Sequence, residues 1–456
     1  MADKKIIAIV AIVVVVAIVA VAAFVLLSNN NGGDKPSGED FSASTRMLIY
    51  GNANNDDYLN SDDVKYIQGV IDGTITWDKK NYPFVDTNTD GKITSDDVTL
   101  LQKFLDGKSA TMYYMNWYGE TKTISYPLSG NIVGSYIQVA DLCIVVGVYD
   151  KVVGIKDTAE KIKTYDQVQY PNGATQIKSV RGDTNVFDVQ KCLAVDANIV
   201  LSDPFALTDS FVSGMKAAKP TVNIIELPIN RSINNIDWTH TIITLGGMMN
   251  LQKNTEKYVK YVENVESKIS EKLDAVKKKY SDETFLICYM PSNETTTDLD
   301  ILGKGVVQYG DVINMLRLPV KCSIDPLEEE GYIENYPIEK VITNNPSIIC
   351  VETWGFINSY TEEEYVNTIK TMVDYFKATG AYKNNRVVSM AYEVFGTVPG
   401  MSGLISMGAI LWPDIFSEEE GIKLMNEYYR NFTYLGSDFD VSKLRGYLPE
   451  QWGATI

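Results

Sequence analysis

The segment from Asn254 to Tyr280 constrains the fold most, because it is the longest uninterrupted helical pattern after the N-terminal region. Its apolar residues recur at steps of three or four, which places them on one face of a helix: Tyr258, Val262, Val265, Ile269, Leu273, Val276 and Tyr280. The opposite face carries Lys and Glu, and Asn254 is the predicted N-cap. At about 1.5 Å per residue the helix reaches roughly 40 Å, the length of a whole domain. Similar strand and helix patterns flank it, so it is predicted to join two α/β lobes.

Length and charge limit the classes of protein that fit. A chain of 456 residues is too long for one core, and roughly three folded units are usual at this size. The net charge of -18 argues against binding a phosphate backbone, so no nucleic-acid partner is predicted. The five cysteines form no CxxC pair and are predicted to be mostly core residues, with one disulfide left open. The single histidine, His240, cannot build a His-rich zinc site and is assigned a structural role.

The N-terminus carries a membrane signal. Ile6 to Leu27 is a run of 22 apolar residues without a charge, enough to cross about 30 Å of hydrocarbon. Lys4 and Lys5 precede it, which predicts a single-pass cell-membrane protein with the bulk of the chain extracellular. A cleaved signal peptide is the alternative, although the apolar run is longer than usual. Residues 1–28 are therefore predicted to be a signal anchor, and residues 29–46 a flexible Gly-, Ser- and Asn-rich linker.

An internal repeat follows the linker. SDDVKYIQGVIDG at Ser61–Gly73 and SDDVTLLQKFLDG at Ser95–Gly107 share four leading residues, a Gln and a closing Asp-Gly, at an offset of 34 residues. A 12-residue, oxygen-rich loop lies ahead of each copy and ends in its leading Ser-Asp-Asp: Asn52–Asp63 and Asp86–Asp97. Calcium takes six to eight hard oxygen ligands, which a loop of this length presents from alternate positions. Two loops in register, each followed by an apolar helix pattern, predict calcium as a cofactor.

The ligand positions of a calcium loop assign the metal-binding residues. In the second loop, with Gly91 at the sharp turn, they are Asp86, Asn88, Asp90, Lys92 through its carbonyl, Thr94 and Asp97. In the first loop they are Asn52, Asn54, Asp56, Tyr58, Asn60 and Asp63. The first loop is the weaker match, because Asn52 replaces the leading Asp and Asp57 replaces the Gly. Ile93 is expected to pair its loop with Leu59. Clusters of Asp and Asn that only form turns are the alternative.

The two loops end in Asp rather than Glu, and each is followed by one helix without a preceding helix. Over about Leu48 to Gly107 the pair resembles a type I dockerin. The resemblance implies a calcium-folded α module, residues 47–110, that docks on a cohesin-domain protein. The contacts that it implies are Ser61, Asp62, Lys65, Ser95, Asp96, Gln102 and Lys103. A calcium-stiffened spacer that needs no partner is the alternative.

The rest of the chain has an α/β pattern with an internal match. Val189–Ser202 and Ile338–Val351 align without a gap as a helix end, a loop and a buried strand. We therefore predict two Rossmann-like lobes of related design, joined by one long helix and preceded by the small repeat and the N-terminal helix. The predicted boundaries are residues 111–250 for the first lobe, 251–280 for the linking helix and 281–456 for the second lobe.

From Tyr114 to Phe432 this pattern resembles the substrate-binding proteins of iron-siderophore and cobalamin uptake, which have a single linking helix. The motifs that carry the resemblance are GVYDKVVG at Gly147–Gly154, LGGMMNLQKNTEKY ahead of the linking helix, and the closing run LISMGAILWPDIFSEEEGIKLMNEYYRNF. The resemblance implies an extracytoplasmic receptor that binds a metal chelate or corrinoid and delivers it to an ABC permease. Family members contact the permease through one Glu on each lobe. Glu339 occupies that position in the second lobe, and Gln190 stands there in the first.

Ligand contacts are expected in loops at the carboxyl ends of strands, where both lobes face the cleft. The candidates are Tyr136, Arg181, Trp354 and Tyr392. Arg181 suits carboxylate or catecholate oxygens, and the aromatic side chains suit a flat ligand. The sequence contains no nucleophile elbow, P-loop or dinucleotide fingerprint, so an enzyme is not predicted. The alternative function is a cell-surface scaffold that acts mainly through dockerin–cohesin binding.

Overall fold

A computed structural model describes residues 45–164, 170, 174–203, 206–229, 238–289, 298–302, 321–322, 332–353, 373–391 and 398–441. The predicted anchor, residues 1–28, lies outside these ranges, as does most of the predicted linker. Among the helices within them, none has the length and apolar character needed to cross a membrane. The last two residues of the predicted linker are part of the fixed structure, since Thr45 is buried and the Arg46 side chain is 17% exposed.

The first lobe is built on a parallel sheet in the order β5-β4-β3-β6-β7. Its strands are β3 (Asn131–Gly134), β4 (Val152–Ile155), β5 (Lys178–Ser179), β6 (Ala197–Ser202) and β7 (Asn223–Glu226). The helices of this lobe are α4 (Gln138–Val146), α5 (Ala159–Thr164), α6 (Val189–Ala194), α7 (Asp209–Ala218) and α8 (Trp238–Met248), with the short η3 (Tyr149–Lys151). β6 is buried at every position except Asn198, as its apolar run Ile199–Leu201 requires of a strand inside a parallel sheet.

An antiparallel hairpin precedes this sheet. It consists of β1 (Ala110–Met115) and β2 (Thr121–Tyr126), and its tip is fixed to the sheet because the Trp117 backbone N–H donates to the Glu226 carbonyl at 3.3 Å. The tip therefore lies beside the carboxyl end of β7.

The second lobe has a mixed sheet in the order β11-β9-β8-β12-β13, with β10 also paired to β8. Its strands are β8 (Thr284–Tyr289), β9 (Asp298–Leu302), β10 (Lys321–Cys322), β11 (Tyr332–Pro337), β12 (Ile348–Thr353) and β13 (Val387–Ala391). Its helices are α11 (Ile338–Asn344), α13 (Gly380–Lys383), α15 (Gly400–Leu411) and α16 (Glu418–Phe432). β8, β12 and β13 run parallel, whereas β9 is antiparallel to β8. The internal match of the sequence reappears here, because α6 leads into β6 and α11 leads into β12, each an interior strand of its sheet.

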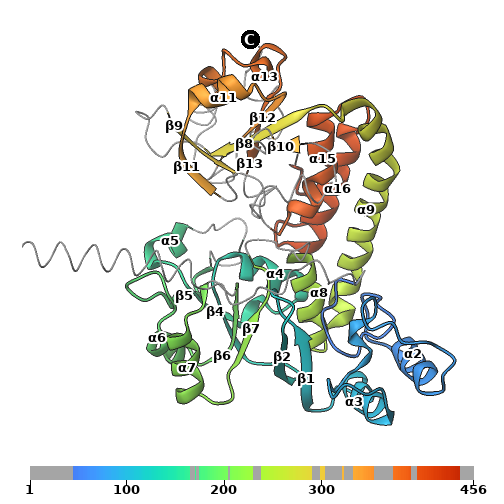
Figure 1. Cartoon of the computed structure of the whole chain (residues 1–456). Coiled ribbons are helices and arrows are strands. Elements are labelled where there is room, and N and C mark those ends of the chain that lie inside the picture. Colours follow the sequence, from blue (N-terminus) through green and yellow to red (C-terminus); the bar gives the residue numbers. More distant parts are fainter. Residues whose placement is uncertain are drawn as a thin grey trace, which may run out of the picture.

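A single helix, α9 (Gln252–Tyr280), connects the lobes and runs along one side of the molecule (Figure 1). The predicted apolar face is confirmed, since Tyr258, Val262 and Val265 are buried. The predicted N-cap is wrong: the helix begins at Gln252, and Asn254 lies inside it. The Asn254 amide instead donates to the Val146 carbonyl at 2.8 Å, which ties the helix to the end of α4.

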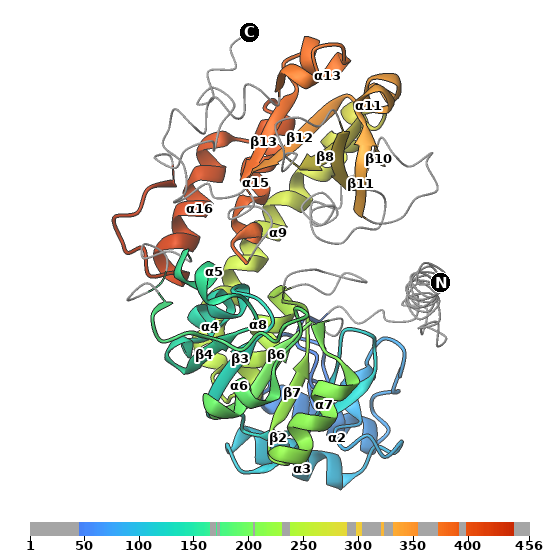
Figure 2. The same ribbon diagram turned by 90° about the vertical axis from the view of Figure 1, so that its left-hand side faces the viewer.

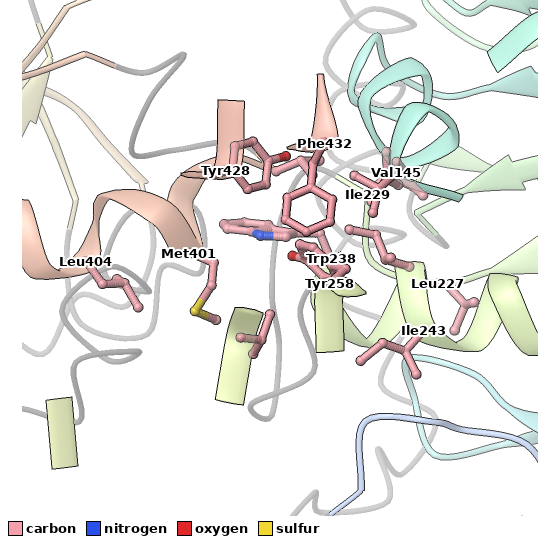
Figure 3. Packing of buried hydrophobic residues seen from close by; sticks show 14 of the residues in the cluster. Val145, Leu227, Ile229, Trp238, Ile243, Tyr258, Met401, Leu404, Tyr428 and Phe432 are labelled. Atoms are coloured by element: carbon pink, nitrogen blue, oxygen red, sulfur yellow. The ribbon is translucent and has the colours of Figure 1, made fainter. Parts of the chain in front are cut away.

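Aromatic and aliphatic side chains from both lobes pack around α9 (Figure 3). Phe432 of α16 lies 5.4 Å from Tyr258 and 5.6 Å from Tyr261, measured between ring centroids. Trp238 of α8 and Val145 of α4 join the same cluster from the first lobe. The relative position of the lobes is therefore set by a packed core as well as by the connecting helix. Figure 2 shows the second lobe stacked over the first along this axis.

The repeat forms two loop–helix units with helices α2 (Ser61–Ile71) and α3 (Ser95–Leu105), and the short η2 (Pro83–Val85) precedes the second loop. Each helix starts with a capping box. In α2 the Asn60 side chain caps the helix backbone and the Asp63 side chain accepts from the Asn60 backbone N–H. In α3 Thr94 and Asp97 form the same pair of contacts. The repeat shares one hydrophobic core with the lobes. Met47, Leu48 and Ile49 are fully buried, and a Cβ placed on Gly247 of α8 would lie 2.6 Å from the Ile49 side chain.

Candidate functional site

The carboxyl ends of the first lobe's parallel strands meet at one edge of the sheet. Tyr136 follows β3, Lys156 and Asp157 follow β4, Arg181 follows β5, and Asp203 follows β6. In a parallel sheet this edge is where ligands bind, because the connecting loops converge there. The second lobe is stacked over this lobe in Figure 2.

Lys156 is the most unusual residue at this edge, because a buried ammonium group is rare. It is 5% exposed, and its Nζ lies 5.1 Å from the centroid of the Tyr136 ring. Nζ also donates a hydrogen bond to the Asn185 carbonyl at 3.1 Å. Burial and the neighbouring Arg181 guanidinium lower the pKa of Lys156, and the Asp157 and Asp203 carboxylates oppose that change. The ammonium is thus held at a position where an anion would stabilise it.

Arg181 adds a second positive charge beside Lys156. Its side chain is 30% exposed, and its guanidinium approaches Asp157 only to 4.0 Å. The main chain of Arg181 is fixed by a bridge to Phe187, and its carbonyl accepts from Lys191 Nζ at 2.7 Å. The backbone of Arg181 is therefore held in place while its side chain remains partly exposed. Such a pair suits an anionic group with several oxygens, such as a carboxylate or catecholate.

The structure brings two of the predicted ligand residues together. Tyr136 and Arg181 both lie next to Lys156, whose pKa is lowered first by burial and then by the Arg181 charge. Trp354 and Tyr392, the other two predictions, lie outside the described residues. Sequence reasoning missed Lys156, although the rule that selected Arg181 also applies to it: the residue directly follows the apolar run VVGI.

The hairpin tip adds an aromatic side chain at the other end of the edge. Tyr118 is 41% exposed, and its backbone N–H donates to the Asn116 side chain at 3.0 Å. Asn116 also donates to Glu226 at 2.8 Å, which is in turn 3.3 Å from Lys122. Burial, followed by the charges of Glu226, Glu120 and Asp203, raises the pKa of Tyr118, so this ring lies near the carboxyl ends of β6 and β7.

The two predicted permease contacts occupy equivalent places on the two lobes. Gln190 is exposed in the first turn of α6, and Glu339 is exposed in the first turn of α11. In the described part of the structure, neither side chain forms a hydrogen bond or an ion pair. Both surfaces are therefore accessible to a partner.

The second predicted calcium loop is closed by its own carboxylates. Asp86 accepts from the backbone N–H groups of Asp90 at 3.1 Å and Gly91 at 2.8 Å. Asp97 is buried and accepts from the backbone of Asn88 at 3.1 Å and Thr94 at 2.8 Å. Gly91 has φ +85°, the left-handed turn that the sequence predicts at this position.

The first loop repeats part of this pattern. Asp63 is buried and accepts from the backbone of Asn54 at 3.2 Å and of Asn60 at 2.9 Å, as Asp97 does in the second loop. The difference lies at Asp57, which occupies the place of Gly91. It points out of the loop, accepting from the Arg46 backbone at 2.6 Å and pairing with the Arg46 guanidinium at 2.7 Å.

Asn52, the leading residue of the first loop, is fully buried. Its Nδ2 donates to Thr45 Oγ1 at 2.7 Å and to the Met47 carbonyl at 3.1 Å. Its Oδ1 is buried and accepts no hydrogen bond from any residue that the structure describes. An unpaired buried amide oxygen at the first ligand position fits a loop that binds a cation.

The raised pKa values of the buried loop carboxylates also fit a site that binds a cation. Burial raises the pKa of Asp63 to about 7, and the Asp56 carboxylate adds to the rise. Burial likewise raises the pKa of Asp97, followed by the charges of Asp86 and Asp90. Within the described ranges, no three His, Cys, Asp or Glu side chains converge in the manner of a metal centre. The other oxygens that the loops offer are those of Asn, Thr and the main chain, which are ligands suited to calcium rather than to a transition metal.

The expected pairing of Leu59 with Ile93 is wrong. The Leu59 backbone N–H donates instead to the Gln252 Oε1 atom at 2.6 Å, and Gln252 Nε2 donates to the Leu59 carbonyl at 3.4 Å. The side-chain amide of the first residue of α9 thus takes the place of a neighbouring strand. The side chains with which the repeat would contact a cohesin partner remain exposed: Ser61, Asp62, Lys65, Ser95, Asp96, Gln102 and Lys103.

The two lobes and the single linking helix make up a two-lobed α/β fold. A TroA-like periplasmic binding protein, FepB, from Veillonella parvula is similar to this chain, with a TM-score of 0.56, 14% identity, and coverage of 72% of this chain and 97% of that one. A periplasmic solute binding protein from Veillonella parvula DSM 2008 has a TM-score of 0.54 and 13% identity, over 73% of this chain and 95% of that one. At these identities the likeness concerns the fold. No family model matches the sequence, and no curated protein matches it.

Proposed function

We propose that this chain is the solute-binding component of an ABC importer, and that it takes a metal chelate or a corrinoid between its lobes. The observation that carries the proposal is the buried Lys156 ammonium over the Tyr136 ring, with the Arg181 guanidinium as its cationic neighbour, at the carboxyl edge of the first lobe's sheet. Similar folds in a periplasmic solute binding protein and in a TroA-like periplasmic binding protein support the solute-binding role.

The charge of the pair favours one of these ligands. Lys156 and Arg181 place two cations at this edge, next to the Asp157 and Asp203 carboxylates, in a chain whose net charge is -18. An anionic iron chelate with carboxylate or catecholate oxygens would form charge-assisted hydrogen bonds with Arg181 and would offset the burial of Lys156. A corrinoid would use mainly the aromatic side chains.

The test measures affinity for ferric chelates of different charge. The wild-type chain is titrated with an anionic ferric tris-catecholate, a neutral ferric hydroxamate and cobalamin, using intrinsic tryptophan fluorescence. We expect the catecholate to bind most tightly, and Arg181→Ala to weaken it by about tenfold or more, since a charge-assisted hydrogen bond contributes about 1.5–3 kcal/mol. Lys216→Ala, which removes an exposed cation on α7, is the matched control. Equal loss in both variants, or no binding of any of the three ligands, would contradict the proposal.

The remaining parts of the proposal concern the rest of the chain. The apolar run at residues 6–27 anchors the protein in the cell membrane, and the binding part lies outside the cell. The two loops of the repeat bind calcium, supported by the buried Asn52 oxygen and the buried Asp63 and Asp97 carboxylates. The exposed residues of α2 and α3 dock a cohesin-domain protein, and Glu339 and Gln190 contact the permease.

A cell-surface scaffold is the second candidate function. It is favoured by the exposure of the candidate docking residues, which the first lobe leaves uncovered. Native mass spectrometry of the chain purified from its own cells separates the two functions. A retained metal chelate supports the receptor, whereas calcium without any chelate, together with a co-purifying cohesin-domain protein, supports the scaffold.

A further inference from the structure

We infer that calcium in the first loop and attachment of the repeat to the linking helix are energetically coupled, so that calcium controls how firmly the repeat is held on α9. This inference rests on the proposed calcium binding of the repeat. It concerns residues that lie outside the ligand edge and away from the candidate docking face. A repeat that merely carries a docking surface does not require such a connection.

Two side chains join the first loop to α9. Gln252 forms two hydrogen bonds with the backbone of Leu59, the eighth residue of the loop. Arg46 lies between Asp57, the sixth residue of the loop, and Glu266 of α9, and it forms an ion pair with each of them. The two attachments lie on neighbouring loop positions, between the predicted ligands Asp56, Tyr58 and Asn60. A change in the path of the loop around an ion must therefore move both attachments.

Among the residues that the structure describes, the second loop forms no hydrogen bond or ion pair with α9. Its sixth residue is Gly91, which has no side chain to reach outward, and the hydrogen bonds of its carboxylates stay within the loop. The two loops also differ in charge: the ligand positions of the second contain three carboxylates, Asp86, Asp90 and Asp97, and those of the first contain two, Asp56 and Asp63. Fewer carboxylates lower calcium affinity. The loop connected to α9 is thus the weaker of the two sites.

The unpaired oxygen of Asn52 gives an independent reason to expect an ion in the first loop. Its amide nitrogen is used by Thr45 and Met47, so the oxygen lies on the other side of the amide, at the first ligand position. Thr45 also donates to the Asp56 carbonyl at 2.9 Å and to Asp57 at 3.1 Å. The same small set of contacts therefore holds Thr45, the predicted leading ligand Asn52 and the attachment residue Asp57.

Coupling between two events is reciprocal. If calcium strengthens the attachment to α9, then removing the attachment must weaken calcium binding by the same factor. Gln252→Ala removes both hydrogen bonds to Leu59 without touching any predicted calcium ligand. The loss of two hydrogen bonds predicts that the weaker calcium ion binds about tenfold less tightly, while the tighter ion is unaffected.

The experiment is calorimetric titration of the calcium-free full chain, solubilised in detergent, with calcium chloride. Gln68→Ala is the matched control, because it removes an exposed glutamine amide of α2 that, among the described residues, donates to Asp72 alone. Hydrogen exchange of residues 45–50 and of the first turns of α9, with and without calcium, gives a second measurement. We expect calcium to slow exchange at both places in the wild type and in Gln68→Ala, and to do so less in Gln252→Ala.

The outcomes separate the inference from the proposal on which it rests. Two bound calcium ions with affinities unchanged in Gln252→Ala, or exchange at α9 that is indifferent to calcium, would overturn the coupling and leave the calcium sites intact. A wild-type chain that binds no calcium would overturn both. Neither result depends on whether a metal chelate binds between the lobes.

Discussion

Replacing Phe432 by Ala tests whether the cluster around α9 sets the relative position of the lobes. Phe432 is 7% exposed and ends α16, so its ring fixes the second lobe on the linking helix. Three aromatic rings surround it, with centroid distances of 5.4 Å to Tyr258, 5.6 Å to Tyr261 and 5.6 Å to Tyr428. Ala in its place leaves a cavity between α9 and α16.

The expected loss follows from burial and ring contacts. Truncation of a buried Phe to Ala costs about 3–5 kcal/mol, and each aromatic pair contributes about 0.5–1.5 kcal/mol beyond the buried area. With three pairs the loss should fall in the upper half of that range, about 4 kcal/mol. The assay is urea unfolding followed by tryptophan fluorescence, because Trp238 and Trp412 are fully buried, in the first and second lobes respectively.

The control is Phe439→Ala, the same chemical change at a half-buried residue that contacts one ring, Tyr429, at 4.9 Å. Its free energy of unfolding should fall by only about 1–2 kcal/mol, because less area is buried and one ring pair is lost. A loss for Phe432→Ala below about 2 kcal/mol, or one equal to that of the control, would refute the reasoning. Two separate unfolding transitions in the wild type would also refute it, since they would show that the lobes are not joined by a common core.

Three further predictions concern the repeat and the cysteines. Ile49→Ala should lower the free energy of unfolding of the whole chain by about 3 kcal/mol in urea, because Ile49 is fully buried against α8; unchanged stability would mean that the repeat unfolds separately. Asp86→Ala combined with Asp97→Ala should abolish most of the calcium-dependent rise in the unfolding temperature, and a wild-type chain whose scanning calorimetry is the same with and without calcium contradicts the calcium sites. Burial raises the pKa of Cys192 and of Cys350 to about 12, so at pH 8 only roughly one thiol in ten thousand is a thiolate, and both should resist iodoacetamide until the chain unfolds. Labelling of either cysteine in the folded protein, measured by peptide mass spectrometry, would count against their burial.

Periodicity in the sequence was sufficient to predict α9, because one face of a long helix must be apolar over its whole length to be buried by two lobes. The end of the helix was less predictable. Asn254 is a good N-cap by residue type, but its amide binds the Val146 carbonyl, which is 108 residues away in the chain. A tertiary contact of this kind leaves no local signal, and the helix begins two residues before Asn254, at Gln252.

The candidate sites also contain some residues that a local sequence pattern identifies and others that only tertiary contacts identify. Tyr136 and Arg181 could be selected from the sequence because the residues after parallel strands share one edge, and Lys156 obeys the same rule. That Lys156 is buried depends on Tyr136 and on Asn185 being brought over it by separate loops, which no local pattern records. The attachment of Leu59 to Gln252 is harder still to predict, since the residues are 193 positions apart and the bond replaces the pairing that an isolated calcium-loop pair would form.

The position of Thr45 has a mechanical consequence. Its buried hydroxyl is hydrogen-bonded to the first loop, and the next residue, Arg46, is ion-paired to Asp57 of that loop and to Glu266 near the middle of α9. A displacement of Thr45 and Arg46 would therefore be transmitted through these side chains both to the first loop and to the helix that joins the lobes. The repeat and the linking helix would respond to such a load as one mechanical unit.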